Sequence, residues 1–361
     1  MRIAFDARPF EPGRTGVGRY LEGLFGQWTV LFPEDRLVAL SPRPVHLPGN
    51  LEGRVDVPFS PMGLPGTLWL QTVAPRQAAN AGADLFFGTL GIVPLLGGVP
   101  AVATVHDLTP ILFPAWHSAK NRLGFAPFLG ATVRKARRLV TVSDATRRDL
   151  VARYPRAAAK CRVVHNGFTP LPELEGDAPL SSQPYVLFLG TVEPRKNVER
   201  LVEAMESIWD RRPAFPRLVI AGGDGWGLPG FAQRLAASRH AARIRRTGYV
   251  TPAEAARLIR RARLVAYPSL YEGFGLPALE AMALGTVVVA SSASSLPEVV
   301  GDAGLLPDPT KVEEIAAAVE RAQDDEPFRE RARRLGIERA RGFTWDRAAR
   351  ETRALFEQAL A

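Results

Sequence analysis

The sequence predicts an α/β protein built from two Rossmann-like, doubly wound parallel-sheet domains. Short apolar and β-branched runs alternate with longer helical patterns along nearly the whole chain, as in parallel sheets that helices cover on both faces. The 361 residues, 46% of them hydrophobic, are enough for two cores. A stretch rich in Pro, Gly, Ser and acidic residues also divides the strand series into two halves.

Strand-length runs in the first half define an N-terminal domain over residues 1–170. The six predicted strands are residues 3–7, 37–40, 85–88, 102–106, 139–143 and 163–165. Residues 171–184 show little periodicity and are predicted to be a linker.

The second half repeats the pattern and defines a C-terminal domain over residues 185–342. Its predicted strands are residues 186–190, 218–221, 244–249, 264–267, 287–290 and 304–307. In residues 343–361, Trp345, Ala348, Leu355 and Phe356 recur at helical spacing. This tail is therefore predicted to be an amphipathic helix packed on the rest of the protein.

Ligand sites are expected in the loops that follow strands, because ligands bind beyond the carboxyl ends of an open parallel sheet. The loop after the first strand contains Gly16 and Gly18, which let a phosphate or sugar approach the backbone closely. It is not a complete dinucleotide fingerprint, because Leu21 stands where the third glycine is required. A purely structural turn is the alternative.

A basic pair, Arg195 and Lys196, follows the first strand of the second half beside a predicted helix start. Charge-assisted hydrogen bonds from both side chains would suit a diphosphate, at about 1.5 to 3 kcal/mol each. Surface charge at a helix end is the alternative. Gly223, in a glycine-rich loop after the next strand, again permits close backbone approach.

Two glutamates mark the most informative segment of the chain. Glu272 lies in a loop after a strand, and Glu280 lies within a helix predicted to begin near Gly275 with Pro277 in its first turn. Amides at such a helix start suit an anion or a row of sugar hydroxyls. The amides concerned belong to Gly273, Phe274, Gly275 and Leu276. The alternative is that both glutamates only complement the helix dipole.

His106 ends a predicted strand on the ligand side, next to Asp107. Hydroxyl binding or acid–base chemistry is therefore considered beside an ordinary structural role. The other histidines lack metal-ligand spacing, Cys161 is the single cysteine, and the sequence contains no Asp-x-Asp motif. No metal and no cofactor are expected.

The basic excess lies in the first half: residues 1–172 carry 20 Lys plus Arg against 11 Asp plus Glu, and residues 173–361 carry 26 of each. The span from Lys120 to Arg162 holds 12 basic residues and two acidic ones. Nucleic acid, an anionic membrane face or a phosphorylated acceptor would each fit, and a solvated helix surface is the alternative. No apolar run approaches the roughly 18 residues of a membrane span, and the start lacks a secretory pattern, so a cytoplasmic location is expected.

With these motifs the chain resembles the retaining glycosyltransferases of family 4 over essentially its whole length. Glu272 and Glu280, in a Glu-Gly-Phe-Gly-Leu-Pro frame, match the family's paired glutamates, and Arg195 with Lys196 matches its diphosphate-binding pair. Gly-Val-Gly-Arg-Tyr, Val-His-Asp and Phe-Thr-Trp are similar to mannosyltransferase-like members. The resemblance implies the GT-B fold, with two domains facing a central cleft and a C-terminal helix that crosses back to the first domain.

The resemblance also implies roles for the site residues. Glu272 and the loop amides would hold hydroxyls of the donor sugar, and Glu280 would accept hydrogen bonds from the ribose. Backbone groups near Tyr249 and Val250 would contact the base, and His106 would lie near the sugar or the acceptor. The glycine loop at Gly16 and Gly18 also matches the family.

The implied activity is metal-independent transfer of a hexose, with GDP-mannose favoured as donor, to a hydroxyl of a glycan or lipid-linked acceptor in cell-envelope or polysaccharide biosynthesis. The basic span would contact an anionic membrane, peripherally at the inner face of the plasma membrane, and nucleic acid is not an expected partner. Two other functions stay open: a sugar-nucleotide epimerase of the same fold, and a non-enzymatic protein that binds sugar nucleotides or nucleic acid.

Overall fold

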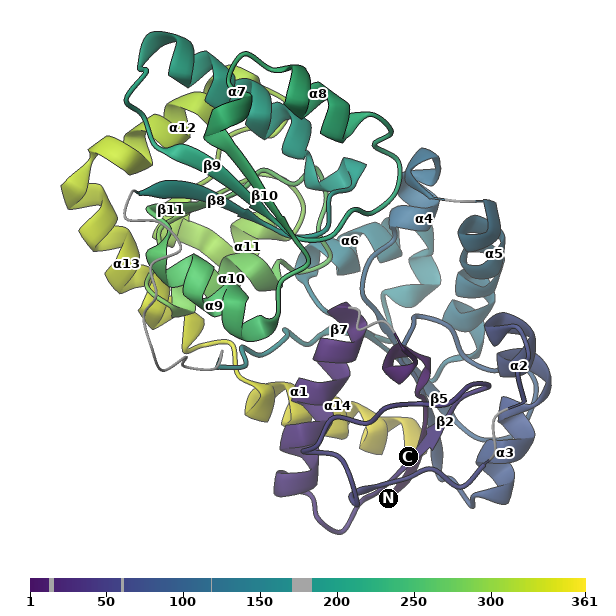
Figure 1. Ribbon diagram of the computed structural model, residues 1–361. Coiled ribbons are helices and arrows are strands. Elements are labelled where there is room, and N and C mark those ends of the chain that lie inside the picture. Colours follow the sequence, from purple (N-terminus) through teal and green to yellow (C-terminus); the bar gives the residue numbers. More distant parts are fainter. Residues whose placement is uncertain (13–15, 60–61, 118, 171–183) are drawn as a thin grey trace. The chain divides into compact units, whose positions relative to one another are not determined.

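Two parallel β-sheets organise the chain, one in each of two units (Figure 1). This computed structural model describes residues 1–12, 16–59, 62–117, 119–170 and 184–361. One unit comprises Met1–Thr169 with Phe343–Ala361, and the other Pro170–Gly342. Residues 171–183 of the predicted linker, and residues 13–15 before the predicted glycine pair, lie outside the described residues. The two sheets confirm the predicted α/β class.

The first unit contains a seven-stranded sheet in the order β3-β2-β1-β4-β5-β6-β7, and all neighbouring strands are parallel. Its strands are β1 (Arg2–Asp6), β2 (Arg36–Leu40), β3 (Val55–Asp56), β4 (Leu85–Gly88), β5 (Ala101–Val105), β6 (Arg138–Thr141) and β7 (Cys161–Val163). The sequence did not predict β3, because two residues are too few to show an alternating pattern. β7 begins two residues before the predicted run at 163–165.

Helices cover both faces of this sheet. They are α1 (Gly16–Leu31), α2 (Gly66–Thr72), α3 (Ala74–Asn80), α4 (Thr109–Leu112), α5 (Ala119–Lys135), α6 (Asp144–Arg153) and α14 (Trp345–Leu360), with single turns η1 (Arg8–Phe10), η2 (Pro114–Trp116) and η3 (Pro155–Ala157). Successive strand residues point to opposite faces, so Ile3 and Phe5 pack in one cluster with α1 and α14. Ala4, between them, packs in another cluster with α2, α3 and α5.

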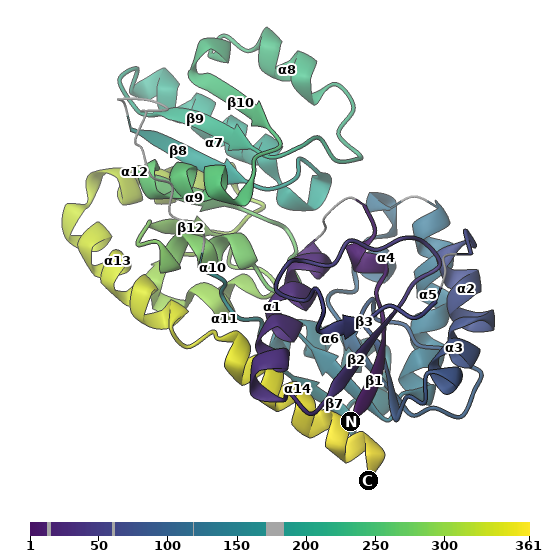
Figure 2. The ribbon, with the colours of Figure 1, turned by 60° about the horizontal axis from the view of Figure 1, so that its bottom comes forward.

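The C-terminal helix α14 packs along α1 (Figure 2). The ring of Phe356 lies between Trp28 and Phe87, at centroid distances of 5.3 and 5.0 Å. Trp345 donates its indole N–H to Thr169 Oγ1 at 2.8 Å. The tail is thus the predicted amphipathic helix, and its apolar face completes the core of the first unit.

The second unit contains a six-stranded parallel sheet in the order β10-β9-β8-β11-β12-β13. Its strands are β8 (Tyr185–Leu189), β9 (Arg217–Ala221), β10 (Ile244–Gly248), β11 (Leu264–Tyr267), β12 (Val288–Ala290) and β13 (Gly304–Leu305). Its helices are α7 (Val198–Arg211), α8 (Phe231–Ala237), α9 (Pro252–Arg261), α10 (Leu276–Ala283), α11 (Leu296–Val300), α12 (Val312–Asp324) and α13 (Glu326–Ala340), with turns η4 (Pro194–Lys196), η5 (Ala241–Arg243) and η6 (Gly301–Ala303). α7, α8 and α12 lie on one face of the sheet, and α9, α10 and α11 lie on the other (Figure 1).

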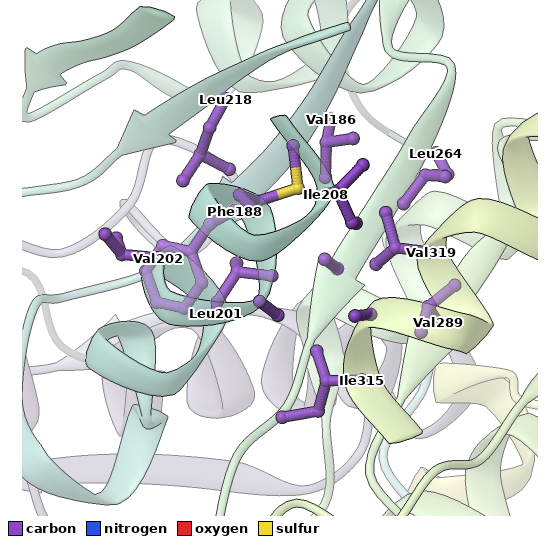
Figure 3. Close-up of a cluster of buried hydrophobic side chains, with 14 of the residues drawn as sticks. Val186, Phe188, Leu201, Val202, Ile208, Leu218, Leu264, Val289, Ile315 and Val319 are labelled. Atoms are coloured by element: carbon purple, nitrogen blue, oxygen red, sulfur yellow. The ribbon is translucent and has the colours of Figure 1, made fainter. Parts of the chain in front are cut away.

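The core of the second unit forms where β8 meets α7 and α12 (Figure 3). Val186 and Phe188, on one face of β8, pack in one cluster with Leu201 of α7 and Val319 of α12. All four side chains are fully buried. Such packing fixes the strand ends, from which the loops of the ligand edge begin.

Both sheets reverse their strand order at one point. In the first unit the reversal falls between β1 and β4, and in the second between β8 and β11. Loops that follow the two strands at a reversal diverge to opposite faces and leave room for a ligand beyond the carboxyl ends. The loops after β8 and β11 contain the basic pair and the first glutamate that the sequence singled out.

Candidate active site

The loop after β8 carries the basic pair on the single turn η4. Asn197 ends this turn with φ of 58°, a left-handed conformation that Asn tolerates better than most residues. Its side-chain amide donates to the carbonyls of Pro268 at 2.9 Å and Pro309 at 2.7 Å. The amide of Leu270 donates to Arg195 O at 2.8 Å. These bonds join the loop after β8 to the loop after β11.

Glu272, in the loop after β11, binds both cations. Its Oε1 accepts from Lys196 Nζ at 2.6 Å, and its Oε2 accepts from Arg195 Nη1 at 2.8 Å. Lys196 is 6% exposed and Glu272 is 5% exposed. The structure therefore brings three of the four predicted catalytic residues into one buried ion cluster in the second unit.

Two further side chains complete the cluster. Glu193 Oε1 lies 2.7 Å from Arg195 Nε. Tyr267, the last residue of β11, accepts a hydrogen bond from Lys196 Nζ, which also lies 4.8 Å from the centre of its ring. The sequence reasoning missed both residues. Their only signals were an acid two positions before the basic pair and a phenol at the end of an apolar strand.

Charge and burial act against each other in this cluster. Burial disfavours the ionised carboxylate of Glu272, but Lys196 and Arg195 outweigh it and lower the pKa to about 2. Burial lowers the pKa of Lys196 despite the attraction of Glu272, and burial raises the pKa of Glu193 despite Arg195. Burial also raises the pKa of Tyr267 well above its usual range, so the phenol stays neutral.

The glycine segment after Glu272 leads into α10, which begins at Leu276 with Pro277 in its first turn. Gly275 caps the helix with φ of 113°, a conformation that requires glycine. This confirms the helix start expected from the sequence. Glu280 lies on α10 and is 4% exposed.

Two serines hold the carbonyls of the same segment. Ser295 Oγ lies 2.9 and 2.7 Å from the carbonyl oxygens of Glu272 and Phe274, which share its single hydroxyl proton. Ser294 Oγ donates to the carbonyl of Glu272 at 2.5 Å. No pattern in the sequence pointed to these two serines, which fix the backbone on which the predicted amides of Gly273 and Leu276 lie.

The other residues of the second unit that were predicted to bind the donor substrate follow β9 and β10. Gly223 follows Gly222, where an added Cβ would lie 2.0 Å from the carbonyl oxygen of Gly190, so a side chain there cannot be accommodated. No atom lies within 4 Å of a Cβ built on Gly223. Tyr249 is 73% exposed, and Val250 beside it is half-buried. β9 separates β10 from β8, so this pair lies to one side of the ion cluster.

His106 lies in the first unit, directly after β5. Its Nε2 lies 2.9 Å from the carbonyl oxygen of Thr89, and Tyr20 contacts its ring edge-on at 4.8 Å. Because a carbonyl only accepts, Nε2 carries the proton and Nδ1 is the acceptor of the neutral ring. Burial lowers the pKa of His106, which keeps the ring neutral near pH 7.

Gly16 and Gly18 form the first turn of α1, after the reversal strand β1. No atom of the described part of the chain lies within 4 Å of a Cβ built on Gly16. Among the described residues, no group of three or more His, Cys, Asp or Glu side chains could hold a metal ion. Within the same ranges, no helix has the length and apolarity required to cross a bilayer.

The chain matches two protein-family models. Residues 16–170 match the family described as glycosyltransferase family 4, and residues 175–339 match the family described as glycosyl transferases group 1. The two matches meet near the division between the two units.

Similar curated proteins include two mannosyltransferases. O-antigen chain mannosyltransferase B of Escherichia coli is 34% identical over 272 residues, which are 70% of this chain and 68% of that protein. MMP alpha-(1->4)-mannosyltransferase of Mycolicibacterium hassiacum is 29% identical over 358 residues, which are 94% of this chain and 79% of that protein.

Solved structures share the fold over nearly the full length. HepE of Anabaena, in complex with UDP-glucose, gives a TM-score of 0.76 at 19% identity and covers 99% of both chains. Sucrose-phosphate synthase of Thermosynechococcus elongatus gives a TM-score of 0.74 at 20% identity, with 99% of this chain and 98% of the other covered.

Proposed function

Because the chain belongs to glycosyltransferase family 4 and has the GT-B fold, we propose that it transfers mannose, with retention, from a nucleoside-diphosphate donor to a hydroxyl acceptor. The observation that carries this proposal is the buried cluster of Arg195, Lys196 and Glu272 where the sheet of the second unit reverses its strand order. Two preorganised cations at a ligand edge suit a diphosphate. The mannosyltransferase relatives support mannose, and GDP-mannose is the favoured donor.

The cations would act on the leaving group. In the proposed reaction the bond between the anomeric carbon and the diphosphate oxygen breaks, and the acceptor oxygen bonds to that carbon on the same face. The acceptor's proton passes to the departing diphosphate. Negative charge thus grows on the diphosphate, where Arg195 and Lys196 stabilise it without a metal ion.

The carboxylates would hold the donor. A carboxylate offers about four acceptor positions, so Glu272 can accept hydrogen bonds from sugar hydroxyls beyond its two bonds to the cations. Glu280 would accept from the ribose, and the backbone at Tyr249 and Val250 would contact the base. The neutral ring of His106, with Nδ1 as acceptor, would bind a hydroxyl of the sugar or acceptor.

We further propose a glycan or lipid-linked acceptor of cell-envelope polysaccharide biosynthesis, reached at an anionic membrane face. The basic span supports this proposal in part. Arg147 and Arg148 pair locally with Asp144, whereas Arg134 in the last turn of α5 and Arg137 just after that helix are exposed. Exposed cations near a membrane surface contribute about 1 kcal/mol each to binding anionic lipid.

Nucleotide release is the test. The protein is incubated with GDP-mannose, UDP-glucose and dTDP-rhamnose, with and without glycan and polyprenyl-linked acceptors, in the presence and absence of EDTA. We expect acceptor-dependent release of GDP that EDTA leaves nearly unchanged, and an α-linked product by NMR. Change of the sugar on the nucleotide without any acceptor would instead indicate the epimerase, and binding without turnover would indicate the non-enzymatic alternative. Abolition by EDTA with rescue by a divalent metal would overturn the metal-free proposal.

A further inference from the structure

Each cation of the buried ion cluster, Arg195 and Lys196, has a second partner besides Glu272. Arg195 directs its Nη1 to Glu272 and its Nε to Glu193. Lys196 directs one N–H to Glu272 and another to the hydroxyl of Tyr267. Glu272 is thus shared between the cations, and Glu193 and Tyr267 each hold one of them.

We propose that Glu193 and Tyr267 are positioning residues that keep Arg195 and Lys196 aimed at the diphosphate while Glu272 engages the donor sugar. The inference rests on the proposed function, because it assigns a second set of partners within the same donor site. Neither residue would contact the reacting atoms.

The Glu193–Arg195 pair is placed for orientation rather than for stability. Glu193 is 2% exposed, and a buried ion pair contributes little net stability against apolar side chains of similar size. The backbone next to Glu193 is fixed by the loop after β9, because the amide of Val192 donates to Gly223 O and the amide of Gly225 donates to Val192 O, each at 3.0 Å. The carboxylate can therefore hold the Nε edge of the guanidinium in a fixed direction.

Tyr267 restricts the ammonium in a comparable way. A lysine ammonium has three donors, and bonds to Tyr267 and Glu272 use two of them, which fixes the direction of the third. Tyr267 is fully buried, and its ring also lies under Lys196 Nζ at 4.8 Å. When Glu272 also engages sugar hydroxyls, the phenol is a second contact that keeps the ammonium in place.

Two isosteric variants isolate these contacts. Glu193→Gln keeps an acceptor and removes the charge, and Tyr267→Phe removes only the hydroxyl and keeps the ring. Matched controls exist in the same unit: Glu203→Gln breaks an exposed pair with Arg234, and Tyr185→Phe removes a buried hydroxyl that donates to Leu258 O at 2.7 Å.

Binding of GDP, UDP and dTDP is measured by calorimetry beside that of GMP, UMP and dTMP, with thermal unfolding as a check of folding. For wild type we expect a gain in affinity from the second phosphate. In each test variant the affinity for the diphosphate should fall about tenfold, as expected for one misplaced charge-assisted bond, and the affinity for the monophosphate should stay nearly unchanged. The two control variants should match wild type.

The outcomes separate the two claims. Test variants that bind diphosphates like wild type, or that weaken mono- and diphosphate binding equally, would overturn the positioning roles while leaving the proposed function intact. A wild-type protein that binds no nucleoside diphosphate would overturn the proposed function and this inference with it. Because the variants act on different cations, one that fails to fold still leaves the other as a test.

Discussion

Lys196 Nζ lies 2.6 Å from Glu272 Oε1, although 76 positions separate the two residues. Each is more than nine-tenths buried, so each serves as the counter-ion that makes burial of the other tolerable. The ligand site and the local stability of the second unit therefore depend on the same two side chains.

Removing one partner should destabilise the second unit. Glu272→Gln leaves the buried ammonium of Lys196 without a carboxylate partner, and we expect the free energy of unfolding to fall by about 3 to 5 kcal/mol. Lys196→Met should cost less, because Glu272 keeps its bond to Arg195. The double variant should recover part of this loss, because it removes both charges. Urea denaturation measures all three. Single variants as stable as wild type would show that the pair is solvated in solution.

Stability should also depend on the protonation of His106. Burial lowers its pKa in the folded state, so below about pH 6.5 the unfolded chain binds the proton more readily, and stability falls with falling pH. The slope for one proton is at most about 1.4 kcal/mol per pH unit. We expect wild type to lose stability relative to His106→Gln between pH 7.5 and 5.5. Parallel stability curves for the two proteins would contradict the shifted pKa.

Gly23 marks a close approach of α1 to the C-terminal helix. A Cβ built there would lie 2.1 to 2.6 Å from ring atoms of Trp345, so Gly23→Ala should destabilise the first unit by about 1 to 3 kcal/mol. Gly124→Ala in α5 is the matched control, because its Cβ would make an ordinary contact at 3.6 Å with Thr67. That control should be neutral or slightly stabilising, since alanine favours helix. Equal melting temperatures for both variants would refute the contact.

Membrane contact through the basic span predicts a charge-dependent interaction. Arg134→Glu with Arg137→Glu should reduce co-sedimentation with vesicles containing anionic lipid, by about tenfold or more if each cation contributes about 1 kcal/mol. The same reversal at the exposed Arg331 and Arg334 in α13 is the control and should change little. Sedimentation that ignores the anionic lipid content, in wild type as in the variants, would exclude this contact.

Most of the strands in the two sheets could be predicted from the sequence, because buried parallel strands consist of short apolar runs bounded by turn residues. The runs at 85–88 and 264–267 agree with β4 and β11 at both ends. At other strands, such as β7, the observed ends differ from the predicted ones by a few residues. Hydrogen-bond register, and not composition, decides where a strand begins.

The candidate site was predicted as one donor site, but its direct ion pairs were not predicted. The sequence placed Arg195, Lys196 and Glu272 in loops, but their mutual ion pairs depend on β8 and β11 being neighbours, which is a property of the strand order. Glu193 and Tyr267 were not predicted as site residues for the same reason. Each can be recognised as part of the site only from its contact with Arg195 or Lys196, which the sequence does not show.

The return of α14 to the first unit has a consequence for synthesis. Residues 170–342 are contiguous and can fold as soon as they leave the ribosome, whereas the first unit lacks one side of its core until residues 343–361 follow. Trp28 and Phe87 lack their contact with Phe356 until α14 has been synthesised. The first unit, most of which is synthesised before the second, is thus completed after it, and its incomplete core is a surface that a chaperone could bind during translation.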